Sequence, residues 1–173
     1  MKRAALYGFL MVCLMGSMLP ISYSQVDWSA KTAKAMEALK SKTNQLGLPK
    51  LEGEEKVSDK KVPGLYFGTT KMNNNFTVID EVKKENSGTA TLFVKSGDEY
   101  VRITTNVQKD DGSRALGTIL DPKGKAIVAI NNGESFAGDV DILGKTYNTR
   151  YEPIKDSKGA VIGIWYVGYL KLE

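Results

Sequence analysis

The chain has 173 residues, and its 24 lysines and arginines against 20 aspartates and glutamates give a net charge of +4 at pH 7. This charge is too small and too evenly interspersed to indicate nucleic-acid binding. The chain has no histidine and a single cysteine, which argues against a structural zinc site, a histidine-ligated haem and any catalytic triad that needs an imidazole.

Residues 1–24 have the layout of a secretory signal peptide. A short positive start (MKR) is followed by an uncharged run up to Leu19 and by small residues before Gln25. Cleavage after Ser24 predicts a periplasmic or secreted protein that loses Cys13 and therefore has no disulfide bond. The apolar run is close to the minimum length of a membrane-spanning helix, so an uncleaved anchor is the alternative interpretation.

Residues 27–46 are predicted to form one long helix. Trp28, Ala35, Met36 and Leu39 fall on one stripe at helical spacing, with lysines on the other faces. Two interpretations are open for this stripe: it packs against its own domain, which we favour, or it pairs with a partner helix in a homodimer.

The charged stretch LEGEEKVSDKK, residues 51–61, has no apolar period and predicts a loop. Residues 25–61 would thus be a helix and a charged connector, and residues 62–173 the folded domain. Residues 62–68, VPGLYFG, are predicted to be an edge strand or a segment that lines a pocket. The stretch NNNFTVIDEVKKENSG that follows predicts a short helix ending before Gly88.

From Thr89 onward the apolar period changes to two. Residues 89–94 and 100–107 predict a hairpin around a glycine-containing turn. One more short helix is predicted within residues 121–133, and three strands follow, at residues 135–143, 145–154 and 160–170. The last strand is apolar on both faces, so we expect it to lie at the centre of the sheet.

This order of elements predicts an α+β domain of the PAS-like kind. It would have a five-stranded antiparallel sheet, a long N-terminal helix, and short helices and a pocket on one face. No motif in the chain indicates a catalytic residue, a metal site or a cofactor, and we expect no enzyme.

Three segments carry a resemblance to a known family. They are VPGLYFGTTKMNNNFTVIDEV, GTATLFVKSGDEYVRITTNVQKDDGSRALGTILDPKG and GESFAGDVDILGKTYNTRYEPIKDSKGAVIGIWYVGYLK. With this order and spacing, the chain from about Val62 to Lys171 resembles the single Cache sensor domains of the Cache 3/Cache 2 fusion type, found in bacterial chemoreceptors and sensor kinases. The resemblance implies a PAS-like fold outside the cytoplasm that binds a small molecule, often a carboxylate, without catalysis.

The family also implies a role in signal transduction, for example in chemotaxis. Typical members are flanked by two membrane helices and joined to a signalling module, whereas this chain has no second apolar run of that length. We therefore expect a separate partner to detect the ligand, such as a membrane receptor or a sensor kinase.

The strand EYVRITTNV supplies the first candidate ligand-binding residues. Arg102, Thr104 and Asn106 alternate along it and are expected to share one face. An arginine can hold a carboxylate with two parallel hydrogen bonds, and the threonine and asparagine would orient the ligand. Arg114, after the polar turn, could close over the same anion. The alternative is that Arg102 is a surface arginine of the sheet.

Tyr147 and Tyr151 complete the candidate set. They alternate on one face of a later strand, where tyrosines line apolar cavities and offer hydroxyl groups to a ligand. Packing in an ordinary core is the alternative. Two functions therefore remain open: a ligand-binding sensor, or a docking protein whose pocket is filled and whose N-terminal helix binds a partner.

Overall fold

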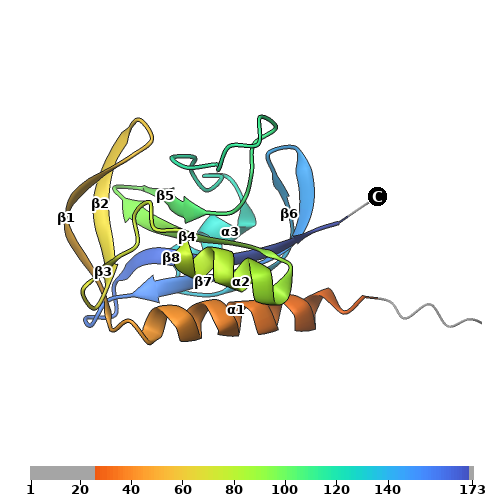
Figure 1. Ribbon diagram of the computed structural model, residues 1–173, viewed down its shortest axis with the longest axis horizontal. Helices are drawn as coiled ribbons and strands as arrows, with labels where there is room; N and C mark the ends of the chain where they lie inside the picture. The colour runs from red at the N-terminus through yellow and green to blue at the C-terminus, as the bar shows by residue number, and fades with distance from the viewer. Residues whose placement is uncertain (1–25, 172–173) are drawn as a thin grey trace, which may run out of the picture.

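The computed structural model describes residues 26–171 as three helices and two antiparallel sheets (Figure 1). The predicted signal peptide lies outside the described residues. The helices are α1 (Trp28–Asn44), α2 (Thr77–Asn86) and α3 (Lys125–Asn131). The small sheet has the order β1-β2-β3, formed by β1 (Pro49–Val57), β2 (Lys60–Phe67) and β3 (Thr70–Lys71).

The large sheet has five strands in the order β5-β4-β8-β7-β6. Its strands are β4 (Thr89–Ser96), β5 (Glu99–Thr105), β6 (Phe136–Ile142), β7 (Lys145–Lys155) and β8 (Val161–Leu170). Each neighbouring pair is antiparallel, and β8 occupies the centre, as its two apolar faces predicted. This architecture confirms the predicted α+β, PAS-like fold class.

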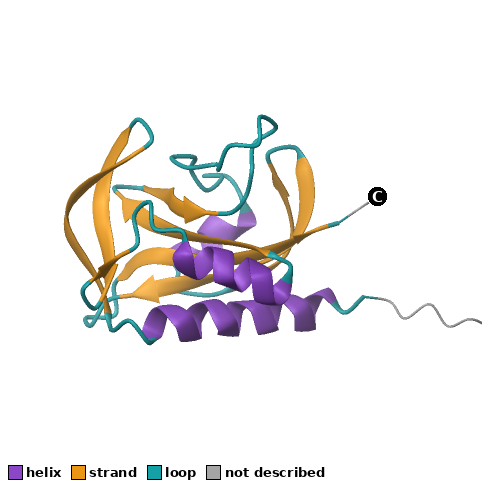
Figure 2. Cartoon of the chain, viewed as in Figure 1, coloured by secondary structure: helices purple, strands orange, loops and turns teal. Residues whose placement is uncertain are grey.

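Helix α1 packs along the large sheet over its whole length (Figure 2). Its first turn is capped by Asp27, whose carboxylate accepts a hydrogen bond of 2.9 Å from the backbone N–H of Ala30. Met36 and Leu39 are buried in the core, and Thr43 accepts a hydrogen bond of 3.0 Å from the Trp165 indole. The apolar stripe of α1 is therefore used inside the domain.

The expectation of a loop at residues 51–61 is wrong. β1 and β2 form an antiparallel hairpin there, turning at Ser58, which adopts a left-handed φ of 58°. β1 is exposed along most of its length, so no apolar alternation marks it. Its backbone pairing with β2 and ion pairs such as Lys71–Glu55, at 2.9 Å, stabilise it instead. β2 is the middle strand of the small sheet, not an edge strand.

The two faces of the large sheet are covered differently. α1, α2 and β2 cover one face, with Leu92 and Trp165 in the core beneath them. α3 and the loops before it cover the other face, where Phe93 and Tyr166 are buried. We call these the α1 face and the α3 face.

Two irregularities of β5 shape the α3 face. The first is a β-bulge: Leu92 pairs with Thr104 but the next residue, Phe93, pairs with Arg102, so that Ile103 is extra. The second is a segment at residues 117–120 that runs along the outer edge of β5. Its backbone is joined to β5 by hydrogen bonds of 2.9–3.0 Å that involve Tyr100 and Arg102. We call residues 117–120 the edge strap.

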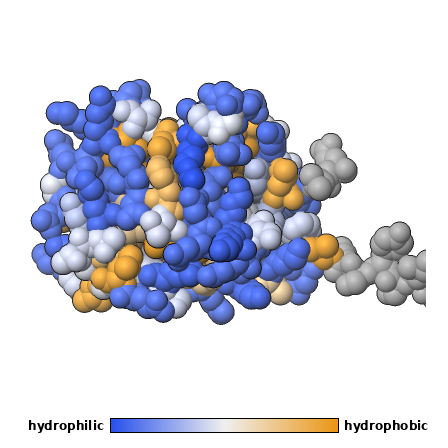
Figure 3. Space-filling view, in the orientation of Figure 1, coloured by the Kyte–Doolittle hydropathy of each residue, from blue (hydrophilic) through white to orange (hydrophobic). Residues whose placement is uncertain are grey.

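The surface in the orientation of Figure 3 is mostly hydrophilic, with hydrophobic residues in small separate groups. Among residues 26–171 no helix is long and apolar enough to cross a membrane.

Candidate functional site

A cavity of about 180 Å³ lies on the α3 face of the large sheet, and we call it the Arg102 cavity. Residues 118–121, which comprise most of the edge strap and Asp121, form one wall, and residues 140–143, at the end of β6, form another. Arg102 and Tyr151 form the rest. Arg102 belongs to β5 and Tyr151 to β7, and these two strands are separated in the sheet by β4 and β8.

Arg102 is buried, with only 5% of its surface exposed. Its Nη1 donates a hydrogen bond of 2.7 Å to Thr118 Oγ1, and its Nε is buried without a partner. Within residues 26–171 no carboxylate lies within 4.0 Å of its guanidinium. The group lies over the Phe93 ring, 5.1 Å from its centroid. Burial lowers the pKa of Arg102, but an arginine side chain remains charged in a protein.

Tyrosines form the floor of the same region. The Tyr151 and Tyr166 ring centroids are 4.9 Å apart, and both side chains are fully buried. Burial raises the pKa of both hydroxyls far above the ordinary value for tyrosine, so both are neutral and able to donate a hydrogen bond. Tyr151 reaches the Arg102 cavity, as the alternation along β7 predicted.

Thr104 and Asn106 do not share a face with Arg102. The bulge at Ile103 turns them to the α1 face, so the expectation of a single row is wrong. Thr104 donates a hydrogen bond of 2.6 Å to the backbone oxygen of Asn75. Asn106 donates one of 2.7 Å to the oxygen of Ile79 and accepts one of 2.7 Å from a backbone N–H of β4. Their polar groups hold α2 and its preceding loop on the sheet.

Arg114 is also directed to α2. It makes two hydrogen bonds of 2.8 Å to the carboxylate of Asp80 and one of 2.8 Å to the backbone oxygen of Thr105. Its guanidinium lies 4.4 Å from the centroid of the Phe76 ring. Arg114 therefore already has a carboxylate partner and lies outside the lining of the Arg102 cavity.

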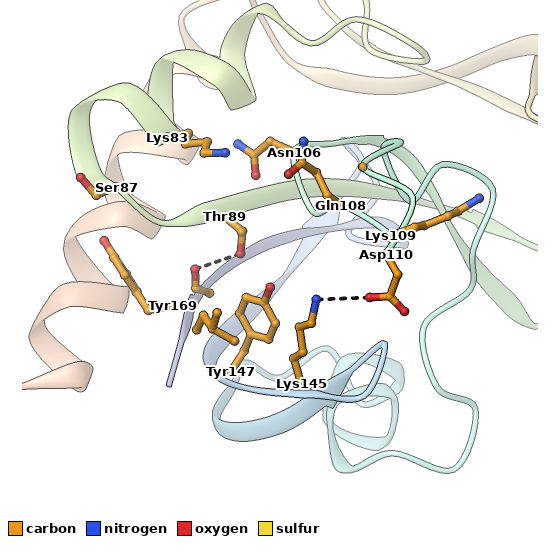
Figure 4. A pocket seen from close by; sticks show the side chains of 13 residues that line it. Lys83, Ser87, Thr89, Asn106, Gln108, Lys109, Asp110, Lys145, Tyr147 and Tyr169 are labelled. Atoms are coloured by element: carbon orange, nitrogen blue, oxygen red, sulfur yellow. Dashed lines mark hydrogen bonds and ion pairs between the residues drawn. The ribbon is translucent and has the colours of Figure 1, made fainter. Parts of the chain in front are cut away.

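Tyr147 lines a second cavity of about 480 Å³, shown in Figure 4. This cavity lies between the end of α2, the loop after β5 and the strand ends of β7 and β8. We call it the lysine cavity, because Lys83, Lys109 and Lys145 line it. Asn106 is also in its lining. The six candidate residues are thus divided between two cavities and a structural network.

Two residues that contact the Arg102 side chain were not predicted. Phe93 lies on β4, opposite Arg102. Its contact with the guanidinium depends on the register between β4 and β5, which an apolar residue in a strand does not reveal. Thr118 lies in the polar turn region after β5, and the backbone pairing of the edge strap with Tyr100, Val101 and Arg102 brings this region beside the strand. Neither pairing can be read from local sequence.

The chemistry that these residues allow is binding of an anion. In the part of the chain that the structure describes, no cluster of acidic, cysteine or histidine side chains could hold a metal ion. A buried guanidinium, a neutral tyrosine and apolar residues such as Val140 and Ile142 are the components of a binding pocket for a small organic anion. Asp121 and Asp141 also line the cavity, so an anion is held on the Arg102 side.

Comparison with known proteins gives a match along nearly the whole chain. The family model described as the Cache 3/Cache 2 fusion domain matches residues 20–173, including α1 and both sheets. No curated protein matches the chain.

Proposed function

Since the chain belongs to the Cache 3/Cache 2 fusion domain family, we propose that it binds a small carboxylate in the Arg102 cavity and signals the bound state to a separate partner. Domains of this family are extracytoplasmic sensory modules that bind ligands and do not catalyse reactions. The family supports a sensor in general terms, and the carboxylate and its site are our proposal.

The observation that carries this proposal is the buried, unpaired charge of Arg102. A buried charge is strongly unfavourable unless it is paired and hydrogen-bonded. Thr118 satisfies one donor of the guanidinium, while Nε has no acceptor. A ligand carboxylate in the adjoining cavity would supply the missing negative charge and accept two parallel hydrogen bonds.

The size and walls of the cavity limit the ligand. A volume of about 180 Å³ is below the usual range of cofactor sites and fits an organic acid with few carbon atoms. The Tyr151 hydroxyl, kept neutral by burial, can donate a hydrogen bond to a second oxygen of the ligand. Apolar lining residues such as Val140 and Ile142 favour an aliphatic part over a second charge.

The route of the signal would begin at the edge strap. A ligand that takes the Arg102 guanidinium competes with Thr118, which itself donates to the Ala115 oxygen at 2.9 Å. Binding would therefore move Thr118 relative to β5, and a membrane receptor or sensor kinase would detect the altered surface. Partner binding through the apolar stripe of α1 is disfavoured, because that stripe is buried against the sheet. This burial also weighs against the docking-protein alternative.

The test is a thermal-shift screen of the full chain with paired ligands. Acetate, pyruvate and lactate are each compared with the neutral amide of the same shape, in the wild type and in Arg102→Met. A carboxylate at 100 times its Kd should add about 2.7 kcal/mol to the unfolding free energy of the wild type. Neither the amides nor the variant should show this gain. If no carboxylate stabilises the wild type, the cavity is not a carboxylate site and the docking function is favoured.

A further inference from the structure

The lysine cavity is separate from the Arg102 cavity, since the two have no lining residue in common. It is also larger, about 480 Å³ against about 180 Å³. Its walls come from the last turn of α2, the loop after β5, and the ends of β7 and β8. Figure 1 shows that this end of the molecule is also where α1 begins and β8 ends.

The charges around the lysine cavity are mostly positive. Three lysines and one aspartate, Asp110, line it. Lys145 approaches Asp110 at 3.3 Å, but both side chains are at least half exposed, so this ion pair is weak. Lys83 has no carboxylate within 4.0 Å among residues 26–171. In Figure 4 Lys83 and Lys145 reach in from opposite sides, whereas the Lys109 ammonium points away.

Tyr147 supplies an independent sign of a ligand. Its side chain is nine-tenths buried, with 8% of the residue exposed, and its hydroxyl points into the cavity between the two lysines (Figure 4). Among the described residues this hydroxyl has no hydrogen-bond partner, whereas the nearby Tyr169 hydroxyl donates to the Asn86 oxygen at 2.9 Å. Thr89 is likewise satisfied, by the Gly168 oxygen at 2.9 Å. The Tyr147 hydroxyl is therefore a donor that faces the cavity and is free to bind a ligand there.

We propose that the lysine cavity binds a phosphate group between Lys83, Lys145 and the Tyr147 hydroxyl. Lysine ammonium groups act as point charges that approach an anion from any direction, and here they do so from opposite walls. A tetrahedral phosphate offers acceptor oxygens on all sides and matches donors arranged in this way, whereas the planar fork of Arg102 matches a flat carboxylate. The phosphate group comes either from a soluble phosphate ester or from a lipid headgroup.

Binding is measured with the full chain and three probes: inorganic phosphate, glycerol 3-phosphate, and vesicles of phosphatidylcholine with or without phosphatidic acid. The vesicle result is the difference between the two compositions, so that any affinity of the apolar N-terminus for lipid cancels. Calorimetry gives the affinity for the soluble probes, and co-sedimentation gives it for the vesicles.

The variants are chosen to separate the site from general charge. Lys83→Gln and Tyr147→Phe should each weaken binding about tenfold, the loss of one good hydrogen bond. Lys84→Gln is the matched control: it removes the same charge from the next, exposed position of α2, outside the cavity lining. It should leave affinity unchanged.

Each result decides the proposal. Binding of either soluble probe with the expected variant pattern supports it and assigns a soluble source. Binding to phosphatidic acid vesicles alone, with the same pattern, supports it and assigns a lipid source. No binding to any probe overturns it, and so does binding that Lys84→Gln weakens as much as Lys83→Gln. Equal melting temperatures for wild type and Tyr147→Phe exclude misfolding as the cause of a loss.

Discussion

Replacing Arg102 by methionine is expected to stabilise the ligand-free protein while abolishing carboxylate binding. The substitution keeps a long, flexible side chain over Phe93 and removes the positive charge from a site where only 5% of the residue is exposed. It tests whether Arg102 is kept for a ligand or for the fold. Removing an arginine that stabilises the fold lowers the unfolding free energy. Removing an unpaired buried arginine that is kept for a ligand raises the unfolding free energy of the ligand-free protein.

The size of the effect follows from three terms. An uncompensated buried charge costs about 3–5 kcal/mol. The hydrogen bond to Thr118, at 2.7 Å, and the contact with the Phe93 ring together offset about 2–3 kcal/mol of that cost. We therefore expect Arg102→Met to raise the unfolding free energy by about 1–2 kcal/mol, which for a domain of this size corresponds to about 2–8 °C in Tm.

The assay is urea unfolding and thermal melting of the wild type and variant without ligand, followed by melting with the stabilising carboxylate. Arg150→Met is the matched control. Arg150 also has a buried Nε without a partner, but its Nη1 lies 3.4 Å from Glu152, so its charge is compensated. Its removal should change stability by less than about 1 kcal/mol in either direction.

A fall of about 2 kcal/mol or more in the ligand-free Arg102→Met variant would refute this reasoning. It would mean that the guanidinium stabilises the edge strap more than its burial costs, and that Arg102 belongs to the fold.

Two further predictions concern Asn106 and Arg114, the candidates whose side chains bind α2. Asn106→Ala should lower the unfolding free energy by about 2–3 kcal/mol, because two buried backbone groups lose their side-chain partner; an unchanged urea midpoint would contradict its role in holding α2. Arg114→Ala should cost about 1 kcal/mol, since its partner Asp80 is 44% exposed, and should leave carboxylate affinity unchanged. Weaker carboxylate binding in this variant would indicate that Arg114 is part of the ligand site.

The large sheet was predictable because its strands alternate between apolar and polar residues, and because β8 is apolar on both faces. The small sheet was not, since β1 has almost no buried side chains and is held by backbone pairing that leaves no mark in its sequence. A charged strand of this kind looks like a loop until its partner is known.

The candidate site was half predictable. Arg102 and Tyr151 were found because each stands in an alternating strand and both reach one cavity. Thr104 and Asn106 were misplaced because one extra residue, Ile103, reverses the side of every residue after it. Arg114 was misplaced because its partner, Asp80, is 34 residues away along the chain.

The edge strap also covers one of the two edges of the five-stranded sheet. β5 is an edge strand of the five-stranded sheet, and exposed backbone groups on such an edge invite a strand from a neighbouring molecule, which begins aggregation. The strap fills these positions through bonds such as Arg102 N–H to Thr118 O, at 2.9 Å. The segment that forms part of the wall of the Arg102 cavity thus also occupies backbone groups at the β5 edge that could otherwise pair with another molecule. Motions of the strap that keep the β5 edge covered are small. In such motions the side chains rearrange while the strap backbone stays hydrogen-bonded to β5.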